Sequence, residues 1–181
     1  MGRQRYQLLT DEQIAGDPRL QAASQRLLAN VNRALLATFP CSDGFLNVGV
    51  GFQAYKGITP ILRESIICRV GAKTKAEYEL FQHEPLAIHL GVTKEDMQVI
   101  KTGRPEQLST PELQVAIQYV DECLDQLRTS DDTFAKMKKL FNTEQISVIT
   151  ILIGHYKATA LLLRNLDVPL DEKSVDWSTV K

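Results

Sequence analysis

Residues 60–90 read PILRESIICRVGAKTKAEYELFQHEPLAIHL, and this stretch decides the fold. Apolar residues cover most sides of residues 60–71, which is typical of a buried helix, and Thr59 before the first proline marks its start. A second helix is predicted over 74–90, with Gly91 at its end. Because the connection between them is very short, we expect the two helices to pack as an antiparallel pair.

The flanking sequence also has helical spacing, so we predict an all-α bundle of about eight helices. The first is expected over 18–37 with Asp17 as its N-cap, followed by a loop over 41–44. Residues 45–55 fit a loosened helix or a short strand. The last helix is expected over 143–165. Caps of the intervening and last helices are expected at Thr93, at Ser109 or Thr110, at Ser130 and at Asn142.

Composition favours one domain over residues 1–181, with a core at about 20–170 and a C-terminal arm at 171–181. The chain has 181 residues, 44% of them hydrophobic and 24% charged, and a formal net charge of −1. This balance gives no field that would recruit nucleic acid or an anionic membrane. Three cysteines are too few for a disulfide framework, and the longest apolar run stops at His155, short of a membrane span. We expect a cytoplasmic protein.

Two ionisable residues occupy the stripe of the second helix that should face the core. At 100° per residue, Glu79 and His83 align with Ala76, Leu86 and Leu90. A carboxylate four residues before a histidine can orient the ring and favour its protonated form. A histidine held in this way is a candidate general acid or base. The alternative is a surface pair that contributes a few tenths of a kcal/mol.

Glu64 adds a second carboxylate on the preceding helix, on the same face as Cys68. Buried without a partner, Glu64 would be costly and its pKa would be raised, so it needs a partner. An antiparallel pair of helices would bring Glu64 to His83 beside a small apolar cavity. A metal site is disfavoured, because carboxylate-bridged sites in helical bundles use Glu-x-x-His twice and this chain has Glu-x-x-x-His once.

The last helix contributes His155 and Tyr156, which interrupt its apolar run. They are candidates for lining the same cavity. The alternative is a tyrosine hydroxyl that is buried with one hydrogen bond and has no chemical role.

Residues 62–70, 76–83, 87–91 and 153–170, taken together in this order, resemble the carboxymuconolactone decarboxylase family, which has the alkyl hydroperoxidase D-like fold. Glu64 and His83 match the acid and the histidine of the proton relay in the peroxidase branch of that family. Its two cysteine positions fall on Ala76 and Glu79, and Cys68 lies too far away in sequence to replace them. The resemblance therefore implies the branch without thiols, whose members are all-helical homo-oligomers that need no cofactor.

The function expected from these residues is that of a lyase or isomerase without a cofactor, acting on a small cyclic carboxylic acid, lactone or polyketide-like ring of secondary metabolism. His83 would be the general acid or base, Glu79 would orient it and Glu64 would shuttle a proton. A carboxymuconolactone substrate would need a cation from Arg63 or Arg69, and because the sequence places neither arginine in the site, that particular lactone is not expected. The residues expected to line the substrate site are Tyr78, Tyr156, Cys68 and His155.

Two other classes of function stay open at this point. The chain would then be a non-catalytic ligand-binding or assembly protein with a vestigial site, or a redox protein that uses Cys68. The expected partners are a small-molecule substrate and further copies of the chain in a dimer, trimer or hexamer, with no nucleic acid, membrane or metal.

Overall fold

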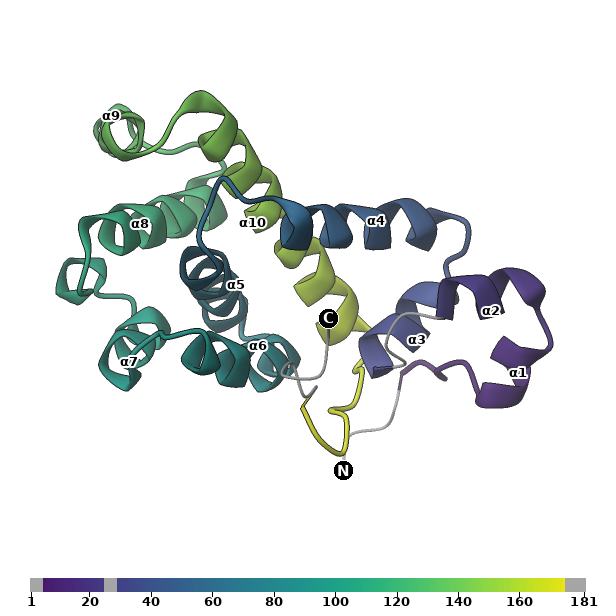
Figure 1. The fold of residues 1–181 in the computed structure, drawn as a ribbon. Coiled ribbons are helices and arrows are strands. Elements are labelled where there is room, and N and C mark those ends of the chain that lie inside the picture. The colour runs from purple at the N-terminus through teal and green to yellow at the C-terminus, as the bar shows by residue number, and fades with distance from the viewer. Residues whose placement is uncertain (1–4, 25–28, 175–181) are drawn as a thin grey trace. The chain divides into compact units, whose positions relative to one another are not determined.

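The computed structural model describes residues 5–24 and 29–174, and these ranges contain ten α-helices, one 3₁₀ turn and no strand (Figure 1). The all-α prediction is confirmed. Helices exceed the expected eight because the helix predicted over 18–37 forms two helices and because a short helix precedes it. The chain divides into two compact units, Tyr55–Ala160 and Met1–Ala54 with Leu161–Lys181, which are described separately.

The unit Tyr55–Ala160 is built around α5 (Pro60–Thr74). Three helices pack against α5: α6 (Glu77–His89), α7 (Lys94–Thr102) and α8 (Pro111–Gln126) (Figure 1). Every residue from Leu62 to Gly71 is buried, polar ones included, as expected of a helix without a solvent-facing side.

The predicted caps open the remaining helices of this unit. Each side-chain oxygen accepts a backbone N–H three residues ahead, which satisfies a donor that the helix leaves free. The distances are 3.0 Å at Thr93, 3.3 Å at Thr110, 3.2 Å at Ser130 and 2.9 Å at Asn142. They precede α7, α8, α9 (Asp131–Leu140) and α10 (Thr143–Asn165), and the 3₁₀ turn η1 (Pro105–Gln107) lies between α7 and α8.

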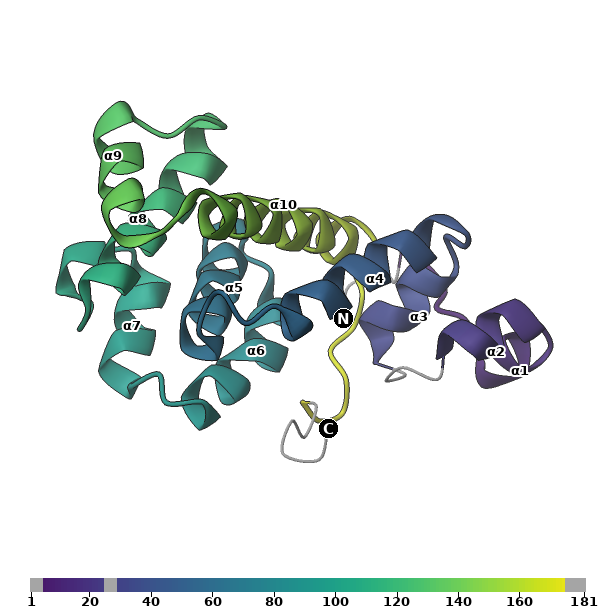
Figure 2. The same cartoon turned by 45° about the horizontal axis from the view of Figure 1, so that its top comes forward.

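The last helix, α10, is continuous, as predicted, and Figure 2 shows its full length. Ile149 and Leu152 of this helix are fully buried in the core. Within the described ranges, α10 is the one helix that length and composition alone would allow to cross a membrane. Helices buried in the core of soluble proteins meet the same criterion.

The unit of residues 1–54 and 161–181 contains α1 (Asp11–Ala15), α2 (Pro18–Ser24), α3 (Asn30–Leu36) and α4 (Cys41–Ala54). At the start of α2, the carboxylate of Asp17 accepts the N–H of Arg19 at 2.9 Å, as a capping residue should.

The prediction for residues 41–55 was wrong in part. The expected loop 41–44 is the first turn of α4, and the uncertain stretch after it continues this helix to Ala54. The carbonyl of Pro40 accepts the N–H of Asp43 at 3.2 Å, so the chain turns helically at once. Burial of Ser42 and Phe52 fixes one face of α4, and this tertiary packing overrides the low helix propensity of its glycines.

Part of the predicted C-terminal arm is also defined. Residues 171–174 are not helical, and the carboxylate of Asp171 accepts the backbone N–H of Asn30 at 2.9 Å, at the first turn of α3. The rest of the arm, including Trp177, lies outside the described residues.

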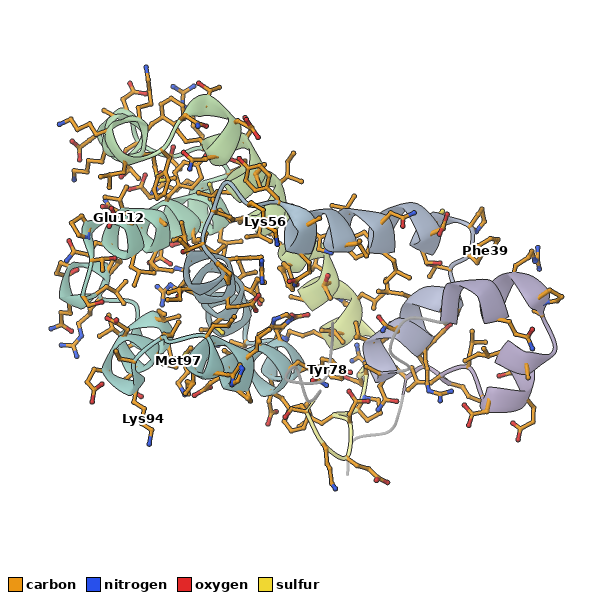
Figure 3. All side chains as sticks on the ribbon, in the orientation of Figure 1. Phe39, Lys56, Tyr78, Lys94, Met97 and Glu112 are labelled. Carbon is orange, nitrogen blue, oxygen red and sulfur yellow. The ribbon has the colours of Figure 1, made fainter. Side chains whose placement is uncertain are left out.

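A buried ion pair joins α5 to α8. Both Nε and Nη2 of Arg69 lie 2.6 Å from the two carboxylate oxygens of Asp121, and Nη1 donates to the carbonyl of Ile100 at 2.7 Å. The guanidinium packs over Gly103, which ends α7 with φ +83°. Figure 3 shows Met97 of α7, which is buried, and Lys94, which points away.

We predict that Gly103→Ala lowers the free energy of unfolding by about 1–3 kcal/mol. A Cβ at this position would lie 2.5 Å from Nη2 of Arg69, and the positive φ disfavours any side chain. Gly154→Ala is the matched control, because a Cβ there meets nothing within 4 Å in α10. It should raise stability by about 0.5–1 kcal/mol. Urea unfolding followed by circular dichroism measures both, and an unchanged midpoint for Gly103→Ala would contradict this packing.

Candidate functional site

The turn between α5 and α6 sets the spacing of the candidate site. Lys75 adopts a left-handed conformation (φ 56°) and ends α5, and Ala76 is the N-cap of α6. One turn into α6, Glu79 lies directly against α5, because Gly71 has no side chain there. A Cβ built on Gly71 would be 3.1 Å from Cβ of Glu79. Gly71 therefore lets a carboxyl group enter the contact between the two helices.

The three predicted residues Glu64, Glu79 and His83 form one buried cluster, with exposed fractions of 0%, 3% and 8%. Nδ1 of His83 lies 2.8 Å from Oε2 of Glu64. On the other side of the ring, Nε2 lies 3.6 Å from Oε2 of Glu79, which is longer than a hydrogen bond. The carboxylate that orients the ring is therefore Glu64. The sequence analysis had given this role to Glu79.

Glu64 and His83 form an ion pair. Burial acts to raise the pKa of Glu64, but the hydrogen bond from His83 and the charges of His83 and Arg63 lower it below its usual value. Burial acts to lower the pKa of His83, yet the hydrogen bond and charge of Glu64 raise it. The raised pKa expected if Glu64 had no partner does not arise, because His83 and Arg63 both bond this carboxylate, and the predicted approach of Glu64 to His83 is confirmed.

Glu79 is the carboxyl group whose pKa is raised. Burial raises the pKa of Glu79 to about 7, a shift that the positive charge of His83 opposes and the negative charge of Glu64 reinforces. A carboxyl group with this pKa exchanges its proton near neutral pH, which is the property required of a general acid or base.

Arg63 is the residue of this cluster whose role the sequence left undecided. Its side chain is 6% exposed, and its Nε donates to Oε1 of Glu64 at 2.9 Å. Residues adjacent in a helix do not face one another, so helical spacing gave no reason to pair them. Arg69, the other candidate cation, is bound to Asp121 and Ile100 and is not available to a substrate.

Two aromatic rings of α10 adjoin the cluster. The ring of Tyr156 meets the ring of His83 edge to face, at a centroid distance of 5.2 Å, and His155 packs on Tyr156 at 5.4 Å. Burial, followed by the charges of Glu79 and Glu64, raises the pKa of Tyr156 well above its usual value, so the phenol keeps its proton. Burial lowers the pKa of His155 to about 4, so this second ring is neutral at pH 7.

The two other residues predicted to line the site are buried, and Cys68 is near enough to feel the charges of Glu64 and Glu79. Tyr78, in α6, and Cys68, in α5, have exposed fractions of 4% and 0%. Burial, followed by the charge of Glu64, raises the pKa of Cys68 well above its usual value. This thiol is therefore kept protonated, which makes it a poor nucleophile.

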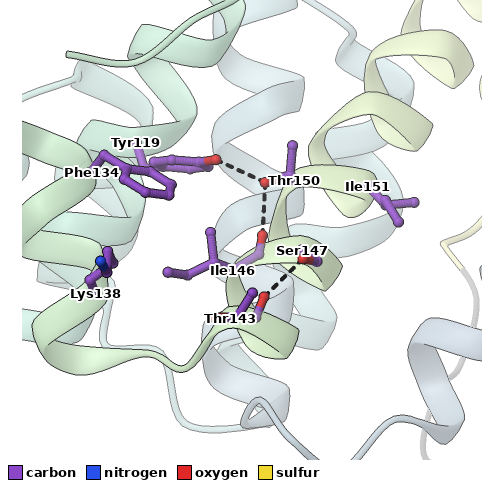
Figure 4. A pocket seen from close by; sticks show the side chains of 8 residues that line it. All are labelled: Tyr119, Phe134, Lys138, Thr143, Ile146, Ser147, Thr150 and Ile151. Carbon is purple, nitrogen blue, oxygen red and sulfur yellow. Dashed lines mark hydrogen bonds between the residues drawn. The ribbon is translucent and has the colours of Figure 1, made fainter. Parts of the chain in front are cut away.

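The structure also contains a hollow that sequence analysis missed, with a volume of about 510 Å³ (Figure 4). Its walls come from α8, α9 and α10, and none of the three cluster residues lines it. Thr150 donates to the carbonyl of Ile146 at 2.7 Å and lies 2.8 Å from the hydroxyl of Tyr119, while Ser147 donates to the carbonyl of Thr143. These hydroxyl groups are engaged with one another or with backbone, and the lining also includes the amine of Lys138.

Metal binding has no support in the described ranges, where no three histidine, cysteine, aspartate or glutamate residues are grouped as ligands. No protein-family model matches the sequence, and no curated protein sequence matches it.

Solved structures do resemble this chain. One is the crystal structure of an alkylhydroperoxidase AhpD core, an uncharacterized peroxidase-related protein from Ralstonia eutropha, with a TM-score of 0.77 and 13% identity over 93% of this chain and 92% of that chain. Another is a protein of unknown function from Agrobacterium tumefaciens, proposed to be the antioxidant defence protein AhpD. Its TM-score is 0.69, at 16% identity over 76% of this chain and 94% of that chain. The chain has the AhpD-like fold.

We predict that Glu79→Gln becomes more stable relative to the parent as the pH rises. Glu79 has a pKa of about 7 in the folded protein and a usual value of 4.5, so the stability it contributes is complete below pH 4.5 and is lost as the pH rises to 7. Glutamine stays neutral throughout. The difference in free energy of unfolding should therefore grow by on the order of 3 kcal/mol between pH 4.5 and 8.

Chemical denaturation at a series of pH values measures this difference. Glu84→Gln is the matched control, because Glu84 lies on the same helix but pairs with Lys101 at the surface, at 2.9 Å. It should show no such growth. A constant difference for Glu79→Gln across the range would mean that this carboxyl group is ionised at all these pH values.

Proposed function

We propose that this protein is a proton-transfer enzyme, a lyase or isomerase that uses no cofactor and acts on a small ring compound with a carbonyl group. The observation that carries the proposal is that a buried carboxyl group, Glu79, lies next to a buried imidazole, His83. Glu79 is a buried carboxyl group with a pKa of about 7, and 3.6 Å away lies Nε2 of a histidine whose positive charge Glu64 stabilises. One group can take or give a proton, while the other donates a hydrogen bond.

The roles follow from the protonation states. Ionised Glu79 removes a proton from the carbon next to the carbonyl group, and the electron pair of that C–H bond moves into an enolate. Nε2–H of His83 donates to the enolate oxygen as its charge develops. Protonated Glu79 then returns the proton to another carbon, which completes an isomerisation. Glu64 holds the ring of His83 and its charge throughout, in place of the shuttling role that the sequence suggested.

Decarboxylation uses the same groups in a related order. The bond to the carboxylate carbon breaks, CO₂ leaves, and the electron pair forms the enolate that His83 stabilises. Protonated Glu79 then supplies the proton to carbon. Tyr156, Tyr78, Cys68 and His155 are proposed to form the walls that exclude water from these steps.

The replacement of a cysteine by Glu79 supports acid–base chemistry over thiol chemistry. In the peroxidase branch that the sequence resembles, positions 76 and 79 carry cysteines, whereas this chain has alanine and glutamate there. Peroxide reduction by cysteine needs an accessible thiolate, and the buried thiol of Cys68 keeps its proton.

We predict that the protein catalyses exchange of the proton next to a carbonyl group, measured by ¹H NMR in D₂O on a panel of ring carboxylic acids, lactones and cyclic diketones. His83→Gln and Glu79→Gln should each lower the rate by about 10²- to 10⁴-fold. The rate of proton removal by the parent should rise as the pH passes 7, because Glu79 must be ionised to act as the base. His89→Gln, an exposed histidine of the same helix, is the control and should leave the rate unchanged.

Other results would favour the alternative functions. Turnover of a hydroperoxide with a dithiol donor, lost in Cys68→Ala, would indicate a redox protein. Absence of exchange and of product across the panel, with folding lost in His83→Gln, would indicate that the cluster serves structure alone.

A further inference from the structure

The hollow between α8, α9 and α10 continues into a second hollow. Their volumes are about 510 and 310 Å³, and the walls of both include Tyr119, Phe134 and Thr150. Because these walls are shared, the two hollows form one groove, which runs from Lys138 in the first hollow to Leu127 in the second. We call it the α9 groove. It contains none of the three residues of the acid–base cluster, so it is a separate site.

The unengaged polar groups of the first hollow lie at one end of it. Figure 4 shows Lys138 and Thr143 below Tyr119 and Thr150, and the two residues stand at the end of α9 and the start of α10. Lys138 is the one charged residue in the lining of this hollow, and it makes no ion pair within the described ranges. The hydroxyl groups of Tyr119, Ser147 and Thr150 are already engaged.

The sides of the groove expose apolar surface to solvent. Phe134 of α9 is 42% exposed and Ile151 of α10 is 57% exposed, and both line the first hollow. Single exposed apolar residues are common on protein surfaces, but apolar residues that gather along one groove are typical of a binding surface. A ligand in the groove would cover both side chains.

Leu127, at the other end of the groove, is kept there at two costs to the folded chain. It ends α8 in a left-handed conformation (φ 62°), which is unfavourable for a residue with a side chain. Its side chain is also 83% exposed, the highest fraction among the large hydrophobic residues of the described ranges. Glycine is the residue that suits such a helix end, and it would remove both costs. Strain of this kind is characteristic of positions that serve a function.

We infer that the α9 groove binds a long-chain carboxylate, a fatty acid, whose carboxylate lies at Lys138 and whose hydrocarbon chain runs past Phe134 towards Leu127. Charge complementarity supports the anionic end, since Lys138 is a cation without a counterion in the folded chain. The volume of the first hollow lies within the range of about 300 to 1000 Å³ that is usual for small-molecule sites.

The walls also select against other classes of ligand. A sugar, a nucleotide or a peptide backbone would bring many hydrogen-bonding groups into a groove whose hydroxyl groups are mostly engaged, and burying such groups without partners is costly. An unbranched hydrocarbon chain needs no hydrogen bonds, and its single carboxylate meets the free amine. The inference does not depend on the proposed function, because the two sites share no residue.

The test of the charged end is isothermal titration calorimetry with octanoate, decanoate and dodecanoate, and with the neutral decan-1-ol. The parent should bind one decanoate per chain, and each step of two CH₂ groups should tighten binding by about three- to tenfold. Lys138→Gln should weaken decanoate binding by about fivefold or more and change decan-1-ol binding little. Lys139→Gln, an exposed neighbour outside the lining, is the matched control and should bind as the parent does.

The apolar walls are tested by two further variants in the same titrations. Ile151→Ser should weaken dodecanoate binding by about fivefold or more, whereas Leu161→Ser, at 58% exposed on the same helix but outside the groove, should not. Leu127→Gly should weaken dodecanoate binding by about threefold or more and yet raise the midpoint of urea unfolding, because glycine relieves the left-handed conformation. A residue that serves structure alone would not give these opposite changes.

Three results would overturn the inference. The first is absence of dodecanoate binding by the parent, and the second is an equal loss of affinity in Lys138→Gln and Lys139→Gln, which would indicate general charge attraction. The third comes from sedimentation velocity. If the parent self-associates, and Leu127→Gly dissociates it while binding dodecanoate as tightly as the parent, a second copy of the chain covers the groove in place of a fatty acid.

Discussion

The buried carboxylate of Glu64 is the group on which the site depends. Isolated in the core it would be too costly to keep ionised, but one oxygen accepts from Arg63 and the other from His83, at 2.9 and 2.8 Å. This arrangement holds an arginine and a histidine, both positive, beside one negative charge. It also fixes which nitrogen of the imidazole faces Glu79.

The second constraint is the close approach of α5 and α6 at Gly71. Because no side chain intervenes, Glu79 lies between the helices, where burial brings its pKa to about 7. The backbone has the AhpD-like fold. In the peroxidase branch that the sequence resembles, the position of Glu79 carries a cysteine. Replacement of the two cysteines by Ala76 and Glu79 would then remove the thiols of a site for sulfur chemistry, while Glu64 and His83 keep their places.

Much of the fold and part of the site follow from sequence. Caps such as Thr93 and Ser130 mark helix starts by a local hydrogen bond, so they are readable without tertiary information. The helical conformation of residues 41–44 could not be predicted in this way, because their composition is typical of a loop and packing of the helix that they begin overrides it. Helical spacing placed Glu79 and His83 on one face, but it could not show that Arg63 turns toward Glu64. Burial acts to raise the pKa of Glu64, but the hydrogen bond and charge of His83, followed by those of Arg63, lower it, so the carboxyl group with a raised pKa is Glu79.

The most direct test of this account is the protonation state of His83, followed by ¹⁵N NMR of the imidazole nitrogens as the pH is raised. The account predicts that the ring of His83 remains an imidazolium at pH values where an ordinary histidine has lost its proton, and that Glu64→Gln abolishes this behaviour by removing the opposing charge. A ring that is already neutral at pH 6 in the unmodified protein would contradict the buried ion pair and the chemistry derived from it.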